Sequence, residues 1–141
     1  MEIMLIIMAT TILISLAVPR IRGMMDQGNI VKVKGELQTL QTAVESYYTY
    51  KTPRVYPPTT TTIGASFLVT ATPALITSVP YDPFGSSTTQ EYDYDLSTNS
   101  KYYVITGVGS NQAEGAIAIS TAGAVSGKDS DDVCVTNGSG C

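Results

Sequence analysis

Hydrophobic positions fill the start of the chain almost without interruption. Across the first 18 residues the only ionisable side chain is Glu2, and the others are apolar or carry a hydroxyl. A helix of about 18 residues is about 27 Å long, close to the roughly 30 Å hydrocarbon thickness of a bilayer. Pro19 ends the run and Gly23 follows it, which predicts a kink in the helix near Pro19. We expect residues 1–23 to form an apolar helical segment that suits a membrane or a protein core.

Three hydroxyl side chains lie within this segment, at Thr10, Thr11 and Ser15. A proline frees backbone groups in the turn before it, and hydroxyls can form hydrogen bonds with such groups. We expect these hydroxyls to take up the groups freed near Pro19. The stretch from Thr10 to Gly23 can either unwind or only kink, and the sequence favours neither.

The next part of the chain, residues 24–52, has one apolar face. Its apolar positions lie three and four residues apart, at Ile30, Val33, Leu37, Leu40, Val44 and Tyr47. Charged and amide side chains fall mostly on the other faces, at Lys32, Lys34, Glu36, Gln38, Gln41 and Glu45. This spacing predicts an amphipathic helix that continues the first segment and stops at the prolines that follow.

Residues 53–90 are rich in Pro, Thr and Ser, which predicts a loop, with one helical turn at the short apolar patch IGASFLV. The sequence DPFG at Asp82 to Gly85 has the residues of a tight turn and is expected to introduce the strands. Apolar and polar residues then alternate over residues 92–96, 101–107 and 115–120. We therefore expect residues 91–141 to form a small antiparallel sheet, with one polar face and one face on the helix, and a C-terminal tail.

The predicted fold class is thus α+β, with one long N-terminal helix packed on a small C-terminal antiparallel sheet. The first segment, residues 1–23, is distinguished from a globular head over residues 24–141. Charge is divided in a similar way, because residues 1–54 carry six Lys and Arg against four Asp and Glu, and residues 55–141 carry two against eight. An acidic head disfavours nucleic-acid binding by a single subunit, since phosphate binding relies on clustered Lys and Arg.

The two cysteines, Cys134 and Cys141, have six residues between them. This spacing does not match a C-x-x-C redox or zinc pair, and the chain has no histidine to complete a zinc site. We expect a disulfide that closes a short loop and holds the tail, which implies an oxidising compartment.

Catalysis is disfavoured by the residues available. The chain has no histidine, no G-x-S-x-G sequence and no base placed to activate a serine or threonine. It also lacks a P-loop, so it cannot supply work from ATP itself. We expect a protein that is not an enzyme.

The retained apolar helix, its single glutamate, the proline and the small sheet together resemble the type IV pilin superfamily. Glu2 and Pro19 have the spacing at which the family places its glutamate and proline. The later sequences YPPT, PYDPFG, YDYDL and YYVITGVGSN resemble those of the major pseudopilin of type II secretion and of pilins built like it. The family has a few more residues before its glutamate, the first of them N-methylated, so we expect this sequence to begin within the mature chain.

This resemblance implies a structural subunit that polymerises into an extracellular type IV pilus-like helical filament. The expected partners are identical subunits, the inner membrane before assembly, the prepilin peptidase and the pilus assembly machinery. Glu2 would pair with the N-terminal ammonium of a neighbouring subunit, and Pro19 and Gly23 would shape the assembly helix. The alternative is the pseudopilin itself, in a short periplasmic filament for protein export. A monomeric membrane protein with a periplasmic binding head is a further alternative.

Two further kinds of site are weighed against simpler interpretations. Asp129, Asp131 and Asp132 could bind calcium, as the C-terminal loop of the resembled pseudopilins does, but a solvated acidic turn is favoured. No other cofactor is expected. Glycosylation at Asn137 or in the run Thr59, Thr60, Thr61 and Thr62 would suit a filament surface, although exposed loop composition alone explains both sequences.

Overall fold

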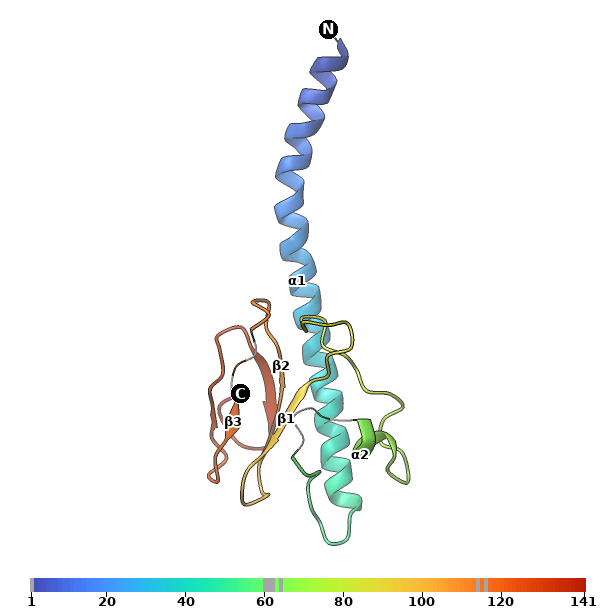
Figure 1. The fold of residues 1–141 in the computed structure, drawn as a ribbon, viewed down its shortest axis with the longest axis vertical. Coiled ribbons are helices and arrows are strands. Elements are labelled where there is room, and N and C mark those ends of the chain that lie inside the picture. The colour runs from blue at the N-terminus through green and yellow to red at the C-terminus, as the bar shows by residue number, and fades with distance from the viewer. Residues whose placement is uncertain (1, 60–62, 64, 114, 116) are drawn as a thin grey trace.

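The structure, a computed structural model, describes residues 2–59, 63, 65–113, 115 and 117–141. It consists of one long helix, α1, and a small β-rich region packed against the second half of that helix (Figure 1). Residues 29–50 of α1 and the chain that follows form the head, and residues 2–28 form the stalk, which extends away from the head. The predicted α+β fold class is confirmed.

The helix α1 runs without a break from Glu2 to Tyr50 and has 49 residues. At 1.5 Å per residue it is about 73 Å long. It bends at residues 16–19, so the predicted kink near Pro19 is confirmed. Because the backbone between Thr10 and Gly23 stays helical, this stretch is kinked and not unwound in the single subunit.

The predicted apolar stripe is the part of α1 that the head covers. Val33, Leu37, Leu40 and Val44 are fully buried, and Tyr47 is nearly so. The stripe packs mainly on the strands β2 (Tyr103–Gly107) and β5 (Val133–Thr136). The three- and four-residue spacing therefore identified the core face of the helix correctly.

The main sheet has three antiparallel strands in the order β1, β2, β5, where β1 spans Asp93–Leu96. Tyr94 pairs with Ile105 across β1 and β2, and Ile105 pairs with Val135 across β2 and β5. The strands predicted at residues 92–96 and 101–107 are confirmed with small shifts at their ends. The third strand, β5, lies in the part of the chain for which the sequence predicts a C-terminal tail.

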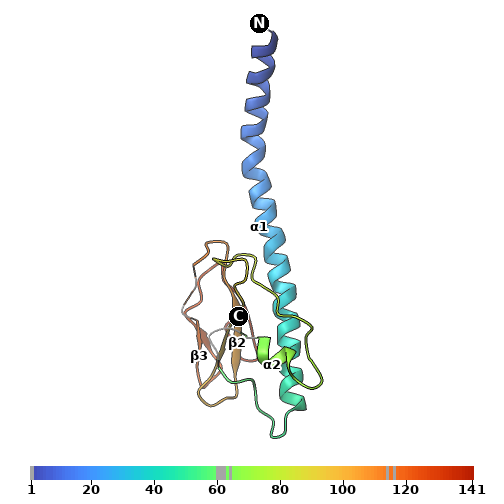
Figure 2. The ribbon, with the colours of Figure 1, turned by 45° about the vertical axis from the view of Figure 1, so that its right-hand side comes forward.

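The prediction that residues 115–120 form a third strand of this sheet is wrong. It contributes only β3 (Ala118–Ile119), which pairs with β4 (Val125–Ser126) in a separate two-stranded sheet. Strand β3 packs against β1 and β2 on the side away from α1, as Figures 1 and 2 show. This second layer leaves β2 buried along its whole length, so the expectation of a polar outer face fails at the central strand.

The loop between α1 and β1 contains one short helix, α2 (Ala65–Val69), where the apolar patch predicted a helical turn. The DPFG turn is also confirmed. The Phe84 N–H donates to Asp82 Oδ1 at 2.8 Å, and the Gly85 N–H donates to the Asp82 carbonyl at 3.1 Å. Asp82 Oδ2 accepts a further bond from the Val108 N–H at 2.6 Å, so the turn is fastened to the end of β2.

Candidate functional site

The stalk exposes apolar side chains in every direction. Among its described large apolar side chains, the exposed fraction ranges from 53% at Ile12 to 81% at Met4. Ile3, Met4, Leu5, Ile6, Ile7 and Met8 are consecutive, so they cover all sides of a helix that turns once in about 3.6 residues. The helix is long and apolar enough to cross a membrane, and none of its most apolar stretch is buried in the subunit. Burial of each such side chain contributes about 1.5–3 kcal/mol, so the stalk requires lipid or other protein around it.

The hydroxyls of the stalk are satisfied within the helix itself. Thr10 Oγ1 donates to the carbonyls of Ile6 and Ile7 at 3.0 Å each. Thr11 Oγ1 donates to the Ile7 carbonyl at 2.7 Å, and Ser15 Oγ donates to the Ile12 carbonyl at 2.9 Å. These polar groups can therefore enter hydrocarbon without needing another partner.

The expected role of these hydroxyls near Pro19 is wrong. Pro19 has no N–H, so the carbonyl that loses its helical donor is that of Ser15. All three hydroxyls bond carbonyls that lie earlier in the chain than Ser15. The reason is geometric, because a Thr or Ser side chain in a helix reaches the carbonyl three or four residues before it.

The three residues expected to serve assembly all lie in the stalk. Glu2 is the first residue of α1, and Pro19 lies in the bend, about 26 Å further along the helix. Their side chains lie outside the described part of the structure. Gly23 is exposed, and a methyl group added there would meet no atom within 4 Å outside the local helix backbone. Gly23 is thus an open position in a helix interior, where glycine costs about 1 kcal/mol relative to alanine.

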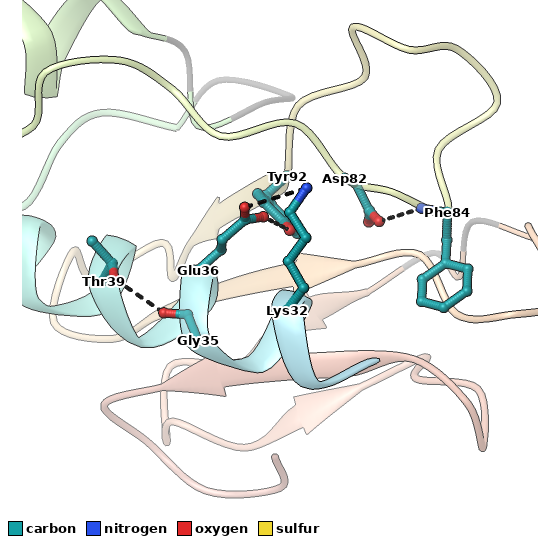
Figure 3. A network of polar contacts seen from close by, with 7 residues as sticks. All are labelled: Lys32, Gly35, Glu36, Thr39, Asp82, Phe84 and Tyr92. Carbon is teal, nitrogen blue, oxygen red and sulfur yellow. Dashed lines mark hydrogen bonds and ion pairs between the residues drawn. The ribbon is translucent and has the colours of Figure 1, made fainter. Parts of the chain in front are cut away.

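Two glutamates of α1 accept hydrogen bonds from buried tyrosines of the β-rich region. Glu36 Oε2 accepts a hydrogen bond from the Tyr92 hydroxyl at 2.5 Å, and Glu36 Oε1 lies 3.6 Å from the Lys32 ammonium (Figure 3). Glu45 Oε1 accepts a bond from the Tyr103 hydroxyl at 2.9 Å. Tyr92 and Tyr103 are fully buried. Burial, and then the bonds to Glu36 and Glu45, raise the pKa of both phenols well above the ordinary value.

The sequence interpretation missed Glu36 and Glu45 because it placed them on the solvated faces of the helix. At about 100° per residue, they border the apolar stripe on opposite sides, where a side chain can bend toward the sheet. The available signal was their position beside the stripe together with tyrosines in the predicted strands. Their bonds join the β-rich region to α1 on two sides of the helix.

The disulfide between Cys134 and Cys141 is confirmed, with a Cα–Cα distance of 5.4 Å, and neither cysteine is free. Cys134 lies in β5, so the bridge ties the end of the chain to the main sheet. Closing so short a loop contributes roughly 2–3 kcal/mol in the chain-entropy description. The disulfide indicates an extracytoplasmic location, and the apolar stalk indicates membrane association or secretion.

The aspartates proposed for calcium lie in the turn before β5. Asp131 accepts bonds from the N–H and the side-chain amide of Asn111 at 2.8 and 2.9 Å, and Asp132 Oδ2 accepts one from the Asp129 N–H at 2.9 Å. The other oxygen of Asp132 is buried and has no partner among the described residues. Calcium takes roughly six to eight oxygen ligands. In the described part of the chain no three acidic, cysteine or histidine side chains gather to hold a metal, and calcium binding at these aspartates stays a prediction.

The residues proposed for glycosylation lie in two places. Asn137 is half-buried, and its Nδ2 donates to the Lys101 carbonyl at 3.0 Å and to the Tyr56 hydroxyl at 3.1 Å. A glycan is attached at this nitrogen, so attachment to the folded head would break these bonds. Thr59 is exposed, while Thr60, Thr61 and Thr62 lie outside the described residues. Glycosylation stays a prediction.

The architecture as a whole is pilin-like, with a long apolar N-terminal helix packed on a small antiparallel sheet and a C-terminal disulfide. No known protein family, curated protein or solved structure matches this chain.

Proposed function

We propose that this chain is a structural subunit that polymerises through its stalk into an extracellular type IV pilus-like helical filament. The observation that carries the proposal is the stalk itself, which has no ionisable side chain over residues 3–19, is exposed where its side chains are described and is continuous with the helix at the centre of the head. Such a helix suits lipid before assembly and a bundle of identical helices afterwards, because both surroundings are apolar.

The spacing of Glu2 and Pro19 favours polymerisation over a simple membrane anchor. An anchor needs only apolar residues, and an ionised carboxylate in hydrocarbon costs at least about 2.5 kcal/mol. In a filament, Glu2 would pair with the N-terminal ammonium of a neighbouring subunit, which neutralises both charges in an apolar core. A subunit docked in the wrong register would leave both charges unpaired and would be rejected.

The proposed partners follow from these two stages, in which the stalk lies first in lipid and then in a filament. They are identical subunits, the inner membrane as the site of the precursor, a prepilin peptidase and the assembly machinery that supplies the work. The role is structural and not catalytic. We assign no nucleic-acid binding to the single subunit.

The test is electron microscopy of material sheared from cells that make the chain, with an antibody against the head to identify its filaments. Wild type is compared with Glu2→Gln and with Asp26→Asn. Both substitutions neutralise one carboxylate of the stalk at nearly constant volume, but only Glu2 has a proposed partner. We expect labelled filaments from wild type and from Asp26→Asn, and few or none from Glu2→Gln.

Two results would contradict the proposal in different ways. If wild-type cells yield no labelled filaments and the detergent-solubilised chain stays monomeric, the chain is a membrane-anchored monomer. If Glu2→Gln assembles as well as Asp26→Asn, the charge pairing is wrong although the filament stands.

The pseudopilin alternative shares this fold and differs in filament length and location. Labelled filaments that appear at natural expression and extend microns from the cell support the pilus. Short filaments that are confined to the periplasm, or that reach the surface only on overexpression, support the pseudopilin.

A further inference from the structure

Three cations gather at one end of the head, and three aspartates share a turn, directly after Lys128, at the other end. At the far end, where α1 stops, Lys51 and Arg54 follow the helix and Lys101 lies in the connection from β1 to β2, and all three are exposed. The two segments are adjacent, because Asn137 Nδ2 donates both to Tyr56 and to the Lys101 carbonyl. Figures 1 and 2 show both connections at the end of the head opposite the stalk. We call Lys51, Arg54 and Lys101 the far-end basic patch.

The near end, from which the stalk leaves, carries the acidic turn of Asp129, Asp131 and Asp132. The turn leads into β5 beside the end of β2, since Val133 pairs with Gly107 and Asp131 binds Asn111 in the loop that follows β2. That loop lies at the stalk end of the head in both ribbon views. Asp132 is only 6% exposed, and one of its carboxylate oxygens has no described partner. We call these three aspartates the near-end acidic turn.

These charges form no ion pairs among the described residues of one subunit. In the described part of the chain the ion pair found is Lys32 with Glu36, and none of the patch or turn residues has an oppositely charged group within 4.0 Å. Strand β5 separates the two ends, and the six steps along the chain from Asp131 to Asn137 span about 20 Å. This distance exceeds twice the roughly 8 Å Debye length at physiological salt, so the two ends hardly attract each other through the subunit.

We infer that in the assembled filament the far-end basic patch of one subunit docks on the near-end acidic turn of the next copy of this chain. The inference rests on the proposed function. When stalks point the same way along a filament, the near end of one head faces the far end of another. A head-to-tail contact of this kind uses two different surfaces and repeats without closing, which generates a helical polymer. The apolar stalks supply most of the association, and the charges fix the axial register of the heads.

An anionic membrane is a poor occupant for the basic patch. The helix rises 1.5 Å per residue, so Lys51 lies about 42 Å along α1 from Gly23. With the stalk in a bilayer, the patch would be several Debye lengths from the lipid headgroups. A nucleic acid would match the patch but not the acidic turn, whereas a second copy of the chain matches both.

The experiment uses the full chain, purified in detergent and polymerised by detergent removal at physiological salt. Polymer is measured by sedimentation and identified by electron microscopy. One variant reverses the patch (Lys51→Glu, Arg54→Glu and Lys101→Glu), one reverses two charges of the turn, exposed Asp129 and half-buried Asp131 (Asp129→Lys and Asp131→Lys), and one combines all five changes. Lys34→Glu is the matched control, because Lys34 is an exposed cation of α1 outside the patch. Near-ultraviolet circular dichroism of the tyrosines confirms that each head is folded.

Two or three ion pairs of ordinary surface strength together change an association constant by roughly tenfold. We therefore expect each reversal alone to raise the concentration needed for polymer about tenfold. The combined variant, whose charges are again complementary, should return to the wild-type value, and Lys34→Glu should not depart from it. High salt should weaken wild-type polymer and bring it toward the reversal variants.

The contrary outcomes are distinct. If wild type forms filaments and the folded reversal variants form them equally well, this inference is overturned while the proposed function stands. If patch reversal weakens assembly but the combined variant does not recover, the patch binds another anion, such as a nucleic acid, and the inference is overturned. If wild type forms no filament here or on cells, both the proposed function and the inference fail.

Discussion

The two halves of α1 share one continuous backbone and have opposite surroundings. Leu37, in the head, is completely buried, whereas Leu13, in the stalk, is 67% exposed. The head half is apolar on one face, whereas residues 3–19 of the stalk have no ionisable side chain on any face. Burial in the subunit therefore accounts for the head half alone, and the stalk is built for surroundings that the subunit does not provide.

The polar groups of the two halves differ in where their hydrogen-bond partners lie. In the stalk, hydroxyls such as that of Thr10 donate to carbonyls of their own helix. In the head, Glu36 and Glu45 accept bonds from tyrosines of other elements. The stalk is therefore satisfied without tertiary partners and can exchange lipid for protein. The head half is committed to one tertiary arrangement.

The largest expected difference between the halves is in core truncation. Leu37→Ala should lower the free energy of unfolding of the head by about 2–5 kcal/mol, because it removes packed methyl groups and leaves a cavity. Leu13→Ala should leave this free energy unchanged, since no subunit atom packs tightly around an exposed side chain. Urea unfolding in mild detergent, followed by near-ultraviolet circular dichroism, measures both. Similar losses from the two substitutions would mean that the stalk contributes to the stability of the head.

Alkaline pH should destabilise the head but not the helix of the stalk. Burial raises the pKa of Tyr92, Tyr94 and Tyr103 well above the value near 10 of an unfolded chain. Above pH 10 the unfolded state therefore binds fewer protons than the folded state, and the free energy of unfolding falls as pH rises. At about 1.4 kcal/mol per phenol per pH unit, the three together remove on the order of 3–4 kcal/mol by pH 11.

Tyrosinate absorbance and circular dichroism, recorded together, test this expectation. The three phenols should ionise only as the near-ultraviolet signal of the head is lost, while far-ultraviolet helix signal from the stalk persists in detergent. Complete ionisation of all tyrosines with an intact head would contradict it.

The disulfide stabilises the head at a point far from the stalk in sequence. Replacing both Cys134 and Cys141 by serine should lower the free energy of unfolding by roughly 2–3 kcal/mol, because the unfolded chain regains the freedom of an open loop. The same urea titration measures the loss. Mass spectrometry of the wild-type chain should show a gain of about two hydrogens on reduction. A double variant as stable as wild type would show that β5 holds the tail without the bridge.

Local patterns predicted much of this fold. The helical stripe, strands β1 and β2, the DPFG turn and the disulfide each depend on residues close together in the chain. Strand β5 was missed because only four residues form it and its partner, β2, lies 26 residues earlier, from Gly107 to Val133. The β3 and β4 layer was missed for the same reason, since two-residue strands carry no measurable alternation.

One part of the candidate site is likewise evident from the sequence, and another part is not. The apolar stalk is evident from composition, because residues 3–19 contain no ionisable side chain. The bonds of Glu36 and Glu45 depend on where Tyr92, just before β1, and Tyr103, in β2, lie in space, and no local pattern predicts that. A charged residue beside an apolar stripe is equally consistent with a solvated border, so only the assembled head distinguishes the two.

The smallest expected effect tests this unpredicted contact. Tyr103→Phe removes the hydroxyl that donates to Glu45 and leaves the ring in place, so it should lower the free energy of unfolding by about 1.5–2 kcal/mol. Tyr50→Phe is the matched control, because Tyr50 lies at the end of the helix that carries Glu45 and is 61% exposed. This substitution should not measurably change the free energy of unfolding. Adding Glu45→Gln to each variant completes a double-mutant cycle, in which a coupling energy is expected between Glu45 and Tyr103 and none between Glu45 and Tyr50. If Tyr103 shows no coupling, the packed stripe alone holds the head, and the glutamates at its borders are ordinary surface charges.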